Sequence, residues 1–489
     1  MRRCSKLKDF TDLALEKAKQ LGATYADIRI LTQHQESVRT KNGNVESMGS
    51  SVSKGFGVRV LHDGAWGFAS SSDLNETQVR GVTAEAVSIA KASATVKRAR
   101  DVELSAVDPV VSKWESKFRI DPFSVKAEDK IGLLLEADSL VRRNKQVRVA
   151  SGSMWCLRED KLFASTEGSY IEQVKTEVGA GIEATATDGR ELQRRSYPNS
   201  AGGDCAAAGY EFVLGMGLAD HAETIASEAV ELLSARQCPG TETDLILDGS
   251  QLGLQIHESC GHPIELDRVF GQEASYAGTS FLTTEKQGTF RYGSEIVNIV
   301  ADATIPGGLG SFAYDDEGVP AQRTVIVDDG MFKNYLSSRE TAFELGQESS
   351  GAMRADGWNR TPIIRMTNIN LEPGDWTLDE MIKDTKQGIY METNKSWSID
   401  DRRLNFQFGT EVAYEIKDGS IGAMLKNPNY TGLTHEFWRS CDAVGNKDEW
   451  RLWGLANCGK GEPGQVAHVG HGAAPARFRN VKVGVGRWT

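Results

Sequence analysis

The sequence predicts an α+β fold in two domains, a mixed α/β N-terminal domain at residues 1–238 and a mainly β C-terminal domain at residues 239–489. Three observations predict it. Helical and strand patterns alternate in the first half, whereas short strands separated by Asp-Gly turns dominate the second half. Between them lies Cys238-Pro239-Gly240, a typical break. A chain of 489 residues also has the usual length of two or more domains.

In the N-terminal domain, apolar residues at helical spacing predict a first helix over residues 10–21. Asn42-Gly43 and Asp63-Gly64 predict tight hairpin turns. The other predicted elements are strands at 25–31, 55–61, 148–157, 162–166 and 171–186, and helices at 79–94, 125–144 and 219–236. No charged pair or histidine cluster here indicates chemistry, so a substrate-channelling or assembly role and a plain scaffold are equally open.

In the C-terminal domain, a strand at residues 243–247 leads into a helix that carries the main motif of the chain. The other predicted elements are strands at 324–327, 331–336, 363–371, 388–393, 403–408, 411–416 and 479–485, and a helix at 433–444. Glycines recur between Gly454 and Gly486 and predict loops close to a site rather than regular structure.

The motif is H-E-x-x-x-H, formed by His257, Glu258 and His262 in a chain with 8 histidines. Two imidazoles and an adjacent carboxylate are typical of zinc hydrolases, in which the imidazoles bind the metal and the carboxylate accepts a proton from water. The spacing is unusual, because residues i and i+5 lie about 140° apart on a regular α-helix.

We therefore expect a short helix over residues 253–261 that is distorted at its end by a π-bulge, a kink or a helix terminus. Gly261 and Pro263 flank His262 and permit the distortion, since Gly tolerates unusual dihedral angles and Pro interrupts the hydrogen-bond ladder. The alternative is a pair of polar residues near a helix end without a metal.

Further segments accompany the motif. They are Tyr314-Asp315-Asp316-Glu317-Gly318-Val319-Pro320, the predicted hairpin at 324–336 with the following Ser337-Ser338-Arg339-Glu340-Thr341, Asn457-Cys458-Gly459-Lys460, and the N-terminal segments 25–29 and 55–67. Together with H-E-x-x-x-H-x-x-E they resemble the TldD/PmbA family. The metal motif is similar to that of its TldD-like metallopeptidase branch, because the PmbA-like branch lacks it.

The resemblance implies a third zinc ligand near the C-terminus, and Cys458 is the matching residue. Two His and one Cys with an open fourth position form an accepted catalytic zinc set. Cys260, inside the motif, and Glu265 are alternative ligands. We expect one Zn²⁺ per catalytic chain, with Glu258 as general base and then general acid.

Four other residues are candidates for supporting roles. Glu265, three residues beyond His262, is the candidate to orient a ligand ring; otherwise it is a surface carboxylate. The family match places Asp315 near the active cleft, where it would bind a peptide amino group; otherwise it belongs to an acidic turn. His468 and His471, in the glycine-rich tail, are candidates to line the cleft and donate to an oxyanion, or are solvated loop residues.

The resemblance implies a peptidase that acts on unfolded or small peptides inside an enclosed dimer, either a homodimer or a heterodimer with a PmbA-like subunit. The alternatives are a non-catalytic peptide- or partner-binding protein with a structural zinc and a zinc amidohydrolase that acts on another amide. The cleavage preference is left open.

Composition bounds the remaining possibilities. The formal charge is −12 and no Lys/Arg block stands out, so we expect no nucleic-acid binding, although family members have been described as modulators of DNA gyrase. We expect no membrane span, because no run of about 18 apolar residues occurs. The 7 scattered cysteines and the absence of an apolar segment after Arg2-Arg3 predict a cytoplasmic protein with reduced thiols.

Overall fold

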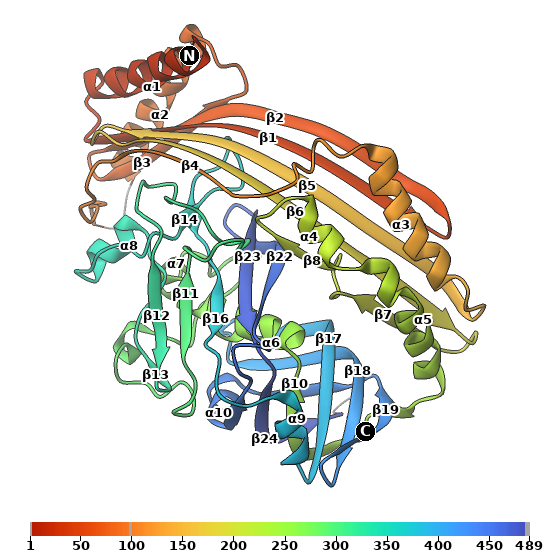
Figure 1. Cartoon of the computed structure of the whole chain (residues 1–489). Coiled ribbons are helices and arrows are strands. Elements are labelled where there is room, and N and C mark those ends of the chain that lie inside the picture. The colour runs from red at the N-terminus through yellow and green to blue at the C-terminus, as the bar shows by residue number, and fades with distance from the viewer. Residues whose placement is uncertain (1, 97–99, 485–489) are drawn as a thin grey trace.

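The computed structural model describes residues 2–96 and 100–484, and it has the predicted α+β fold (Figure 1). In the N-terminal part of these residues, one curved eight-stranded sheet has the order β3-β2-β1-β5-β6-β4, with β7 and β8 also paired to β6. The strands are β1 (Tyr25–Lys41), β2 (Asn44–His62), β3 (Ala65–Ser71), β4 (Val111–Glu115), β5 (Val147–Ser165), β6 (Tyr170–Thr187), β7 (Leu192–Tyr197) and β8 (Asp204–Ala206).

The predicted hairpin turns connect the first three strands. Asn42 and Gly43 have φ of 49° and 81°, and Asp63 and Gly64 have φ of 48° and 66°. Two consecutive left-handed residues are the signature of the tight turn that matches the twist of the strands. The strands are longer than predicted, since a single strand β5 covers both predicted segments at 148–157 and 162–166.

Helices cover one face of this sheet, in two groups (Figure 1). The helices α1 (Arg2–Gln20) and α2 (Glu76–Val96) pack at the β1–β3 end, and α3 (Ala127–Val141), α4 (Tyr210–Gly215) and α5 (Leu218–Ser234) pack on β5, β6 and β7. Side chains alternate along β5. Met154 and Cys156 are buried beneath the helices, whereas Trp155 and Leu157 point to the opposite face and line cavities there.

In the C-terminal half of the described chain, a second eight-stranded sheet has the order β17-β10-β24-β20-β18-β19-β9, with β21 paired to β24. Because β17 pairs with both β10 and β18, part of the sheet closes on itself. The strands are β9 (Arg236–Gln237), β10 (Thr241–Leu247), β17 (Gln387–Ile399), β18 (Asn405–Lys417), β19 (Ser420–Lys426), β20 (Asn429–Leu433), β21 (Cys441–Val444) and β24 (Ala476–Val483). The predicted domain boundary at residue 238 stays a prediction.

Smaller elements lie below the N-terminal sheet and beside the second sheet, with β22 and β23 between the two (Figure 1). One four-stranded sheet has the order β13-β12-β11-β16, and the pairs β14–β15 and β22–β23 form two-stranded ribbons. The strands are β11 (Ile299–Asp302), β12 (Arg323–Asp328), β13 (Met331–Phe332), β14 (Met353–Arg354), β15 (Ile363–Ile364), β16 (Ile369–Leu371), β22 (Arg451–Lys460) and β23 (Gln465–Ala473). The short helices are α7 (Leu266–Val269), α8 (Arg339–Glu344), α9 (Leu378–Lys383) and α10 (Thr434–Arg439), together with the 3₁₀-helix η3 (Thr284–Lys286).

Two predictions for this half are wrong. The predicted helix at 433–444 ends with α10 at Arg439, because Cys441–Val444 pairs with β24 as β21. The glycine-rich tail forms the β22–β23 ribbon rather than loops. The predicted closing strand is β24, which ends at Val483; residue 485 of that prediction lies outside the described residues.

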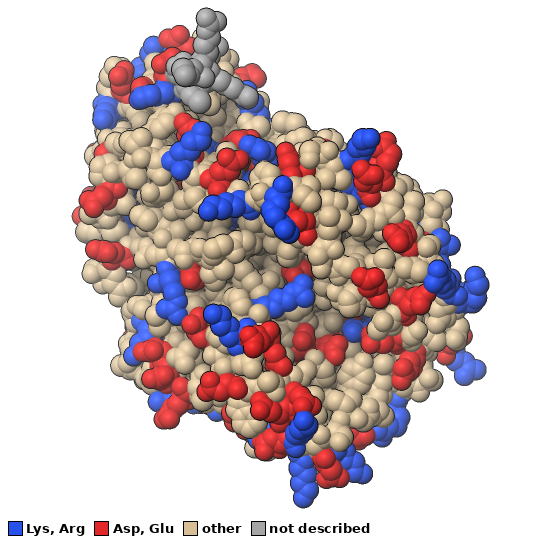
Figure 2. Space-filling view, in the orientation of Figure 1, with Lys and Arg blue, Asp and Glu red and all other residues tan. Residues whose placement is uncertain are grey.

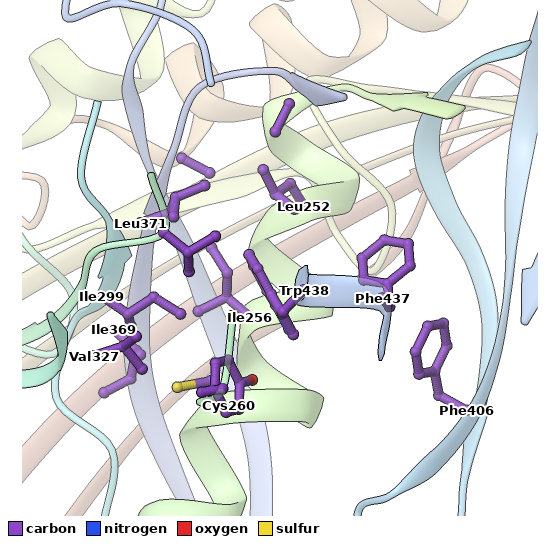
Figure 3. Close-up of a cluster of buried hydrophobic side chains, with 14 of the residues drawn as sticks. Leu252, Ile256, Cys260, Ile299, Val327, Ile369, Leu371, Phe406, Phe437 and Trp438 are labelled. Carbon is purple, nitrogen blue, oxygen red and sulfur yellow. The ribbon is translucent and has the colours of Figure 1, made fainter. Parts of the chain in front are cut away.

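The helix α6 (Gly249–Ile256) follows β10 and lies at the centre of the largest apolar core. Figure 3 shows Leu252, Ile256 and Cys260 from this helix and its extension facing Ile299, Val327 and Trp438. Apolar side chains on both sides fix the helix in position. On the surface shown in Figure 2, Lys and Arg are interspersed with Asp and Glu.

Candidate metal centre

The helix that carries the motif changes its winding at His257. The α-helix α6 ends at Ile256, a π-helical turn (η1, His257–Gly261) follows, and a 3₁₀ turn (η2, His262–Ile264) ends the segment. The amide of His262 donates to the carbonyl of His257, which is the i to i+5 bond of a π-turn. This wider turn brings residues i and i+5 to the same side, and the two imidazole rings lie 4.8 Å apart.

The predicted distortion is therefore confirmed as a π-turn, although the helix begins at Gly249 rather than at residue 253. Gly261 was predicted to tolerate unusual dihedral angles. This reason is wrong, because its φ of −57° and ψ of −58° are ordinary helical values. Glycine is needed there for space: a Cβ at this position would lie 2.1 Å from Sδ of Met366.

Cys458 on β22 joins the two histidines. One donor atom each from His257, His262 and Cys458 lies within 4.8 Å of the others, and all three residues are buried. Cys260 is fully buried in the apolar core, among Ile256 and Ile299 (Figure 3). Among the described residues the geometry thus favours Cys458 over Cys260 as the third donor.

Hydrogen bonds fix which imidazole nitrogens are free. His471 Nδ1 lies 3.3 Å from the carbonyl oxygen of Ile369, and His471 Nε2 lies 2.8 Å from His257 Nδ1. Since a carbonyl oxygen only accepts, His471 carries its proton on Nδ1, and its Nε2 accepts the proton of His257 Nδ1. The Nε2 lone pair of His257 is therefore left for a metal.

His262 is oriented in the same way by a carboxylate. Its Nδ1 lies 2.9 Å from Oε2 of Glu265, and its Nε2 faces Sγ of Cys458 at 3.7 Å. Lys460 Nζ lies 3.5 Å from the same Glu265 oxygen and 2.6 Å from Asp267. Glu265 therefore occupies the predicted orienting position, and the buried Lys460 balances its charge.

The electrostatics of the site suit metal binding. Burial lowers the pKa of His257 to about 4 and that of His262 well below its usual value, so both rings are neutral at pH 7. Burial alone would raise the pKa of Cys458, but the Arg365 guanidinium and His262 outweigh it, and the net pKa is lowered. In contrast, burial raises the pKa of Cys260 to about 12. Metals bind neutral imidazoles and thiolates.

Glu258 lies on the open side of the cluster and forms an ion pair. Its Oε2 accepts a hydrogen bond of 2.6 Å from Nη1 of Arg403, and the two side chains are 8% and 12% exposed. Arg403 comes from the turn between β17 and β18 and is 145 residues away in sequence.

A cavity of about 390 Å³ opens in front of these residues. His257, Glu258, His262, Cys458 and Arg403 contribute to its wall. The N-terminal sheet supplies Trp155 and the segment 199–205 on the other side. The first half of the chain, which carries no chemical motif, therefore helps to enclose the site.

Three of the predicted supporting residues differ in part from expectation. Asp315 does not reach the described wall of this cavity, because its carboxylate is buried and accepts the amides of Glu317, Val319 and Met353 at 2.9–3.0 Å. His471 lines the cavity as predicted, but both its ring nitrogens are engaged, so it orients His257 and has no N–H left for an oxyanion.

His468 lies on β23 and lines a neighbouring cavity of about 110 Å³. Its Nδ1 is 2.5 Å from Glu177 Oε2, and its ring packs against Trp155. Burial would raise the pKa of Glu177, but Lys175 and His468 outweigh it and hold that pKa at about 2.

No sequence pattern predicts Arg403 or Arg365 as part of the site, and a single clue points to Lys460. Arg403 belongs to no motif and is distant in sequence. Arg365 donates to the carbonyls of Cys458 and Gln465, a contact that only the fold creates. Lys460 follows Asn457-Cys458-Gly459 directly, and this position was the one available clue.

Comparison with known proteins identifies the family. The PmbA/TldA metallopeptidase C-terminal domain matches residues 240–485, the central domain matches 120–237, and domain 1 matches 26–100. The chain belongs to the PmbA/TldD family of metallopeptidases.

Curated relatives are similar over almost their whole length. A metalloprotease of Methanocaldococcus jannaschii is 32% identical over 95% of this chain and 97% of its own. A metalloprotease of Methanothermobacter thermautotrophicus is 33% identical over 94% of this chain and 95% of its own. A zinc metalloprotease TldD homolog of Saccharolobus solfataricus is 23% identical over 96% and 98%. The protein is accordingly a metallopeptidase.

Solved structures share the fold. A putative modulator of DNA gyrase from Thermotoga maritima superposes with a TM-score of 0.77 at 18% identity, covering 98% of this chain and 100% of its own. TldE from Thermococcus kodakarensis has a TM-score of 0.72 at 16% identity, covering 96% and 98%. Among the described residues, no helix combines the length and apolar character needed to cross a bilayer.

Proposed function

We propose that this metallopeptidase is zinc-dependent and hydrolyses unfolded or small peptides. The observation that carries the proposal is the buried cluster of His257, His262 and Cys458, which lies in the wall of a cavity beside Glu258. The name of the Saccharolobus solfataricus relative, a zinc metalloprotease, supports the choice of metal.

The donor set fits one zinc ion. Two imidazole Nε2 atoms and a thiolate are common zinc ligands, and three protein ligands are typical of catalytic rather than structural sites. His471 and Glu265 hold the two rings with Nε2 toward the cluster. When bound, the metal would lower the pKa of a water molecule and polarise the carbonyl of the scissile bond.

The residues of the chain supply the remaining chemistry. Oε2 of Glu258 is engaged by Arg403, so Oε1 is the oxygen that we expect to accept the proton of the attacking water. The protonated Glu258 then passes this proton to the leaving nitrogen. Trp155 and Trp397 in the wall offer apolar contacts to side chains of the substrate.

The size of the cavity restricts the substrate. A space of about 390 Å³, lined by residues from both halves of the chain, has room for a few residues of an extended peptide. A folded protein cannot bring its backbone to Glu258 without unfolding locally. This supports unfolded segments and small peptides as substrates.

We also propose a dimer, formed either by two copies of this chain or with a PmbA-like subunit. Residues 44–54 of β2 are exposed and pair with β1 along one edge. Along the other edge, β3 pairs with β2 only from Phe56 onward, so among the described strands residues 44–54 have no second partner. Val45, Met48 and Val52 on this edge are 43%, 62% and 67% exposed. A long open edge strand with apolar side chains is a typical pairing surface.

We place the protein in the cytoplasm. Six cysteines are free and buried, which fits a reducing compartment: Cys156, Cys205, Cys238, Cys260, Cys441 and Cys458.

The two alternatives predict different behaviour. A structural zinc would have four protein ligands, whereas the described cluster has three donors and Glu265 is engaged with His262. An amidohydrolase for other amides would use the same residues but would not cleave peptides.

The test is mass spectrometry of a mixture of unstructured peptides incubated with the zinc-loaded wild type and with Glu258→Gln. We expect cleavage by the wild type alone, with zinc content unchanged in the variant. If neither protein cleaves, and adding a PmbA-like subunit does not restore cleavage, the proposal is wrong and a binding role is favoured. Equal cleavage by both would exclude Glu258 as the base.

A further inference from the structure

Arg403 is held in an uncommon backbone conformation at the wall of the cavity. Its φ is +63°, in the left-handed region that non-glycine residues seldom adopt. Asp400 holds the turn, because its carboxylate accepts the amides of Arg402 and Leu404, and its carbonyl accepts the amide of Arg403 at 2.9 Å. Thr434 Oγ1 donates to the carbonyl of Arg403 at 2.9 Å. Such conformations persist where the surroundings fix them, and they cluster at functional sites.

The side chain of Arg403 has donors to spare. Nη1 donates to Glu258, Nε is buried, and neither Nε nor Nη2 has a hydrogen-bond partner among the described residues. Because Arg403 lines the cavity, Nη2 can donate to a molecule bound there. A guanidinium retains its proton under all ordinary conditions, so it acts as a fixed donor.

Peptide hydrolysis creates a need for such a donor. When water adds to the scissile carbonyl, its oxygen gains negative charge, and a preorganised donor stabilises that charge most when water is excluded. The reacting carbonyl must lie within reach of Glu258, and the Arg403 guanidinium is already one hydrogen bond, 2.6 Å, from that carboxylate.

We propose that Arg403 is a further catalytic residue, which donates a hydrogen bond through its guanidinium to the oxygen of the scissile carbonyl as negative charge develops on it. This inference rests on the proposed peptidase activity and on Glu258 as the base.

The proton balance of the reaction is unchanged by this role. The water oxygen forms a bond to the carbonyl carbon, and Glu258 accepts the proton that the water loses. The carbon–nitrogen bond then breaks, and the proton on Glu258 moves to the leaving nitrogen. Arg403 keeps its protons throughout and contributes only hydrogen bonding and charge.

The wall also carries neutral side-chain donors, such as Asn199, Ser200 and Asn457, but among the described residues none of these hydrogen-bonds to Glu258. Both nitrogens of His471 are engaged by His257 and Ile369. Nε1 of Trp453 has no partner but is buried from the cavity. Among the described residues, the side chain that hydrogen-bonds to the Glu258 carboxylate is that of Arg403, which also carries a positive charge.

The test uses the peptide that the zinc-loaded wild type cleaves fastest in the mixture described above. Arg403→Met should lower kcat by roughly 10²–10³-fold with a smaller change in KM, because the lost contact is made in the transition state. Arg403→Lys should recover part of the loss. Zinc content should be unchanged, and Arg402→Met, which removes the neighbouring exposed arginine, should retain wild-type activity.

A second measurement separates donation to the substrate from support of Glu258. The same peptide with a phosphinate in place of the scissile amide mimics the charged tetrahedral species. Arg403→Met should weaken binding of the phosphinate at least tenfold more than it weakens binding of the uncleaved peptide. The effect should be equally large when Glu258 is present and when it is replaced in a Glu258→Gln background. Loss of this effect in the Glu258→Gln background would show that Arg403 merely positions Glu258.

Two further results would overturn the assignment. If the wild type cleaves the peptide and Arg403→Met retains full activity, the proposed peptidase function stands but Arg403 has no catalytic role. A loss confined to peptides with a free C-terminal carboxylate, and absent after amidation, would make Arg403 a carboxylate clamp instead. A wild type that cleaves no peptide would instead refute the proposed function, and this role with it.

Discussion

Gly261 offers a quantitative test of how packing supports the π-turn. Its backbone is helical, so alanine meets no dihedral strain there. An added Cβ would lie 2.1 Å from Sδ of Met366 and 3.2 Å from its Cγ and Cε. Non-bonded carbon atoms normally approach to about 3.5–4.0 Å, so the Met366 sulfur must retreat by roughly 1.5 Å. Met366 is fully buried, so this shift displaces atoms inside the core.

The expected cost of Gly261→Ala follows from two opposing terms. Overpacking a filled core costs about 1–3 kcal/mol. Alanine in place of glycine inside a helix gains up to about 1 kcal/mol. The packing term is larger, and we expect a net destabilisation of up to about 2 kcal/mol. Gly253→Ala, in α6, is the matched control, because its Cβ would meet its nearest atom at an ordinary 3.4 Å.

Thermal unfolding of the metal-free protein measures the effect. Gly261→Ala should lower the midpoint, and Gly253→Ala should leave it unchanged or raise it. Met366→Ala removes the obstructing atoms, so Gly261→Ala should be harmless in that background, which a double-mutant cycle detects. Equal costs of Gly261→Ala in both backgrounds, or none in the wild-type background, would refute the packing argument.

Two further predictions concern the metal ligands. His471→Ala removes the partner of His257 Nδ1 and should weaken zinc binding about 10–100-fold in a competition assay with a chromophoric chelator, whereas His468→Ala, whose ring bonds Glu177, should not. Equal affinities of the two variants would contradict the orienting role of His471. Cys458→Ser should sharply lower zinc occupancy measured by mass spectrometry of the native protein, whereas Cys260→Ser should leave it unchanged. Equal occupancy in both would reassign the third ligand.

The local features of the site could be predicted because neighbouring residues determine them. The i, i+5 spacing of His257 and His262 required a distorted helix, and the π-turn is that distortion. Glu265 could be placed next to His262 for the same reason, since three residues separate them. Asn42-Gly43 similarly specifies its own turn by backbone preference alone.

The glycine-rich tail could not be predicted, because glycine has two uses that look alike in a sequence. The tail was expected to form loops, yet its glycines permit close packing of the β22–β23 ribbon. A Cβ on Gly454 would lie 1.9 Å from the carbonyl oxygen of Cys205, and one on Gly472 would lie 1.9 Å from the ring of Trp450. These partners are distant in sequence, so only the fold reveals the constraint.

The same limit explains why the sequence does not predict Arg403 as part of the site and leaves two roles open for Asp315. Arg403 meets Glu258 across 145 residues, and no motif connects them. Asp315 lies in a segment that resembles the family, but its carboxylate serves the backbone of its own turn. The neighbouring Asp316 and Glu317 pair with Arg29 and Arg59 of the N-terminal sheet. The acidic turn therefore joins the two halves of the chain.

The most direct test of the central claim is an anomalous difference map from zinc-loaded crystals, recorded at the zinc edge. We expect one peak per chain, bound by His257 Nε2, His262 Nε2 and Cys458 Sγ, with a fourth position open to the cavity and free of protein ligands. A peak elsewhere, or a zinc enclosed by four protein ligands, would contradict it.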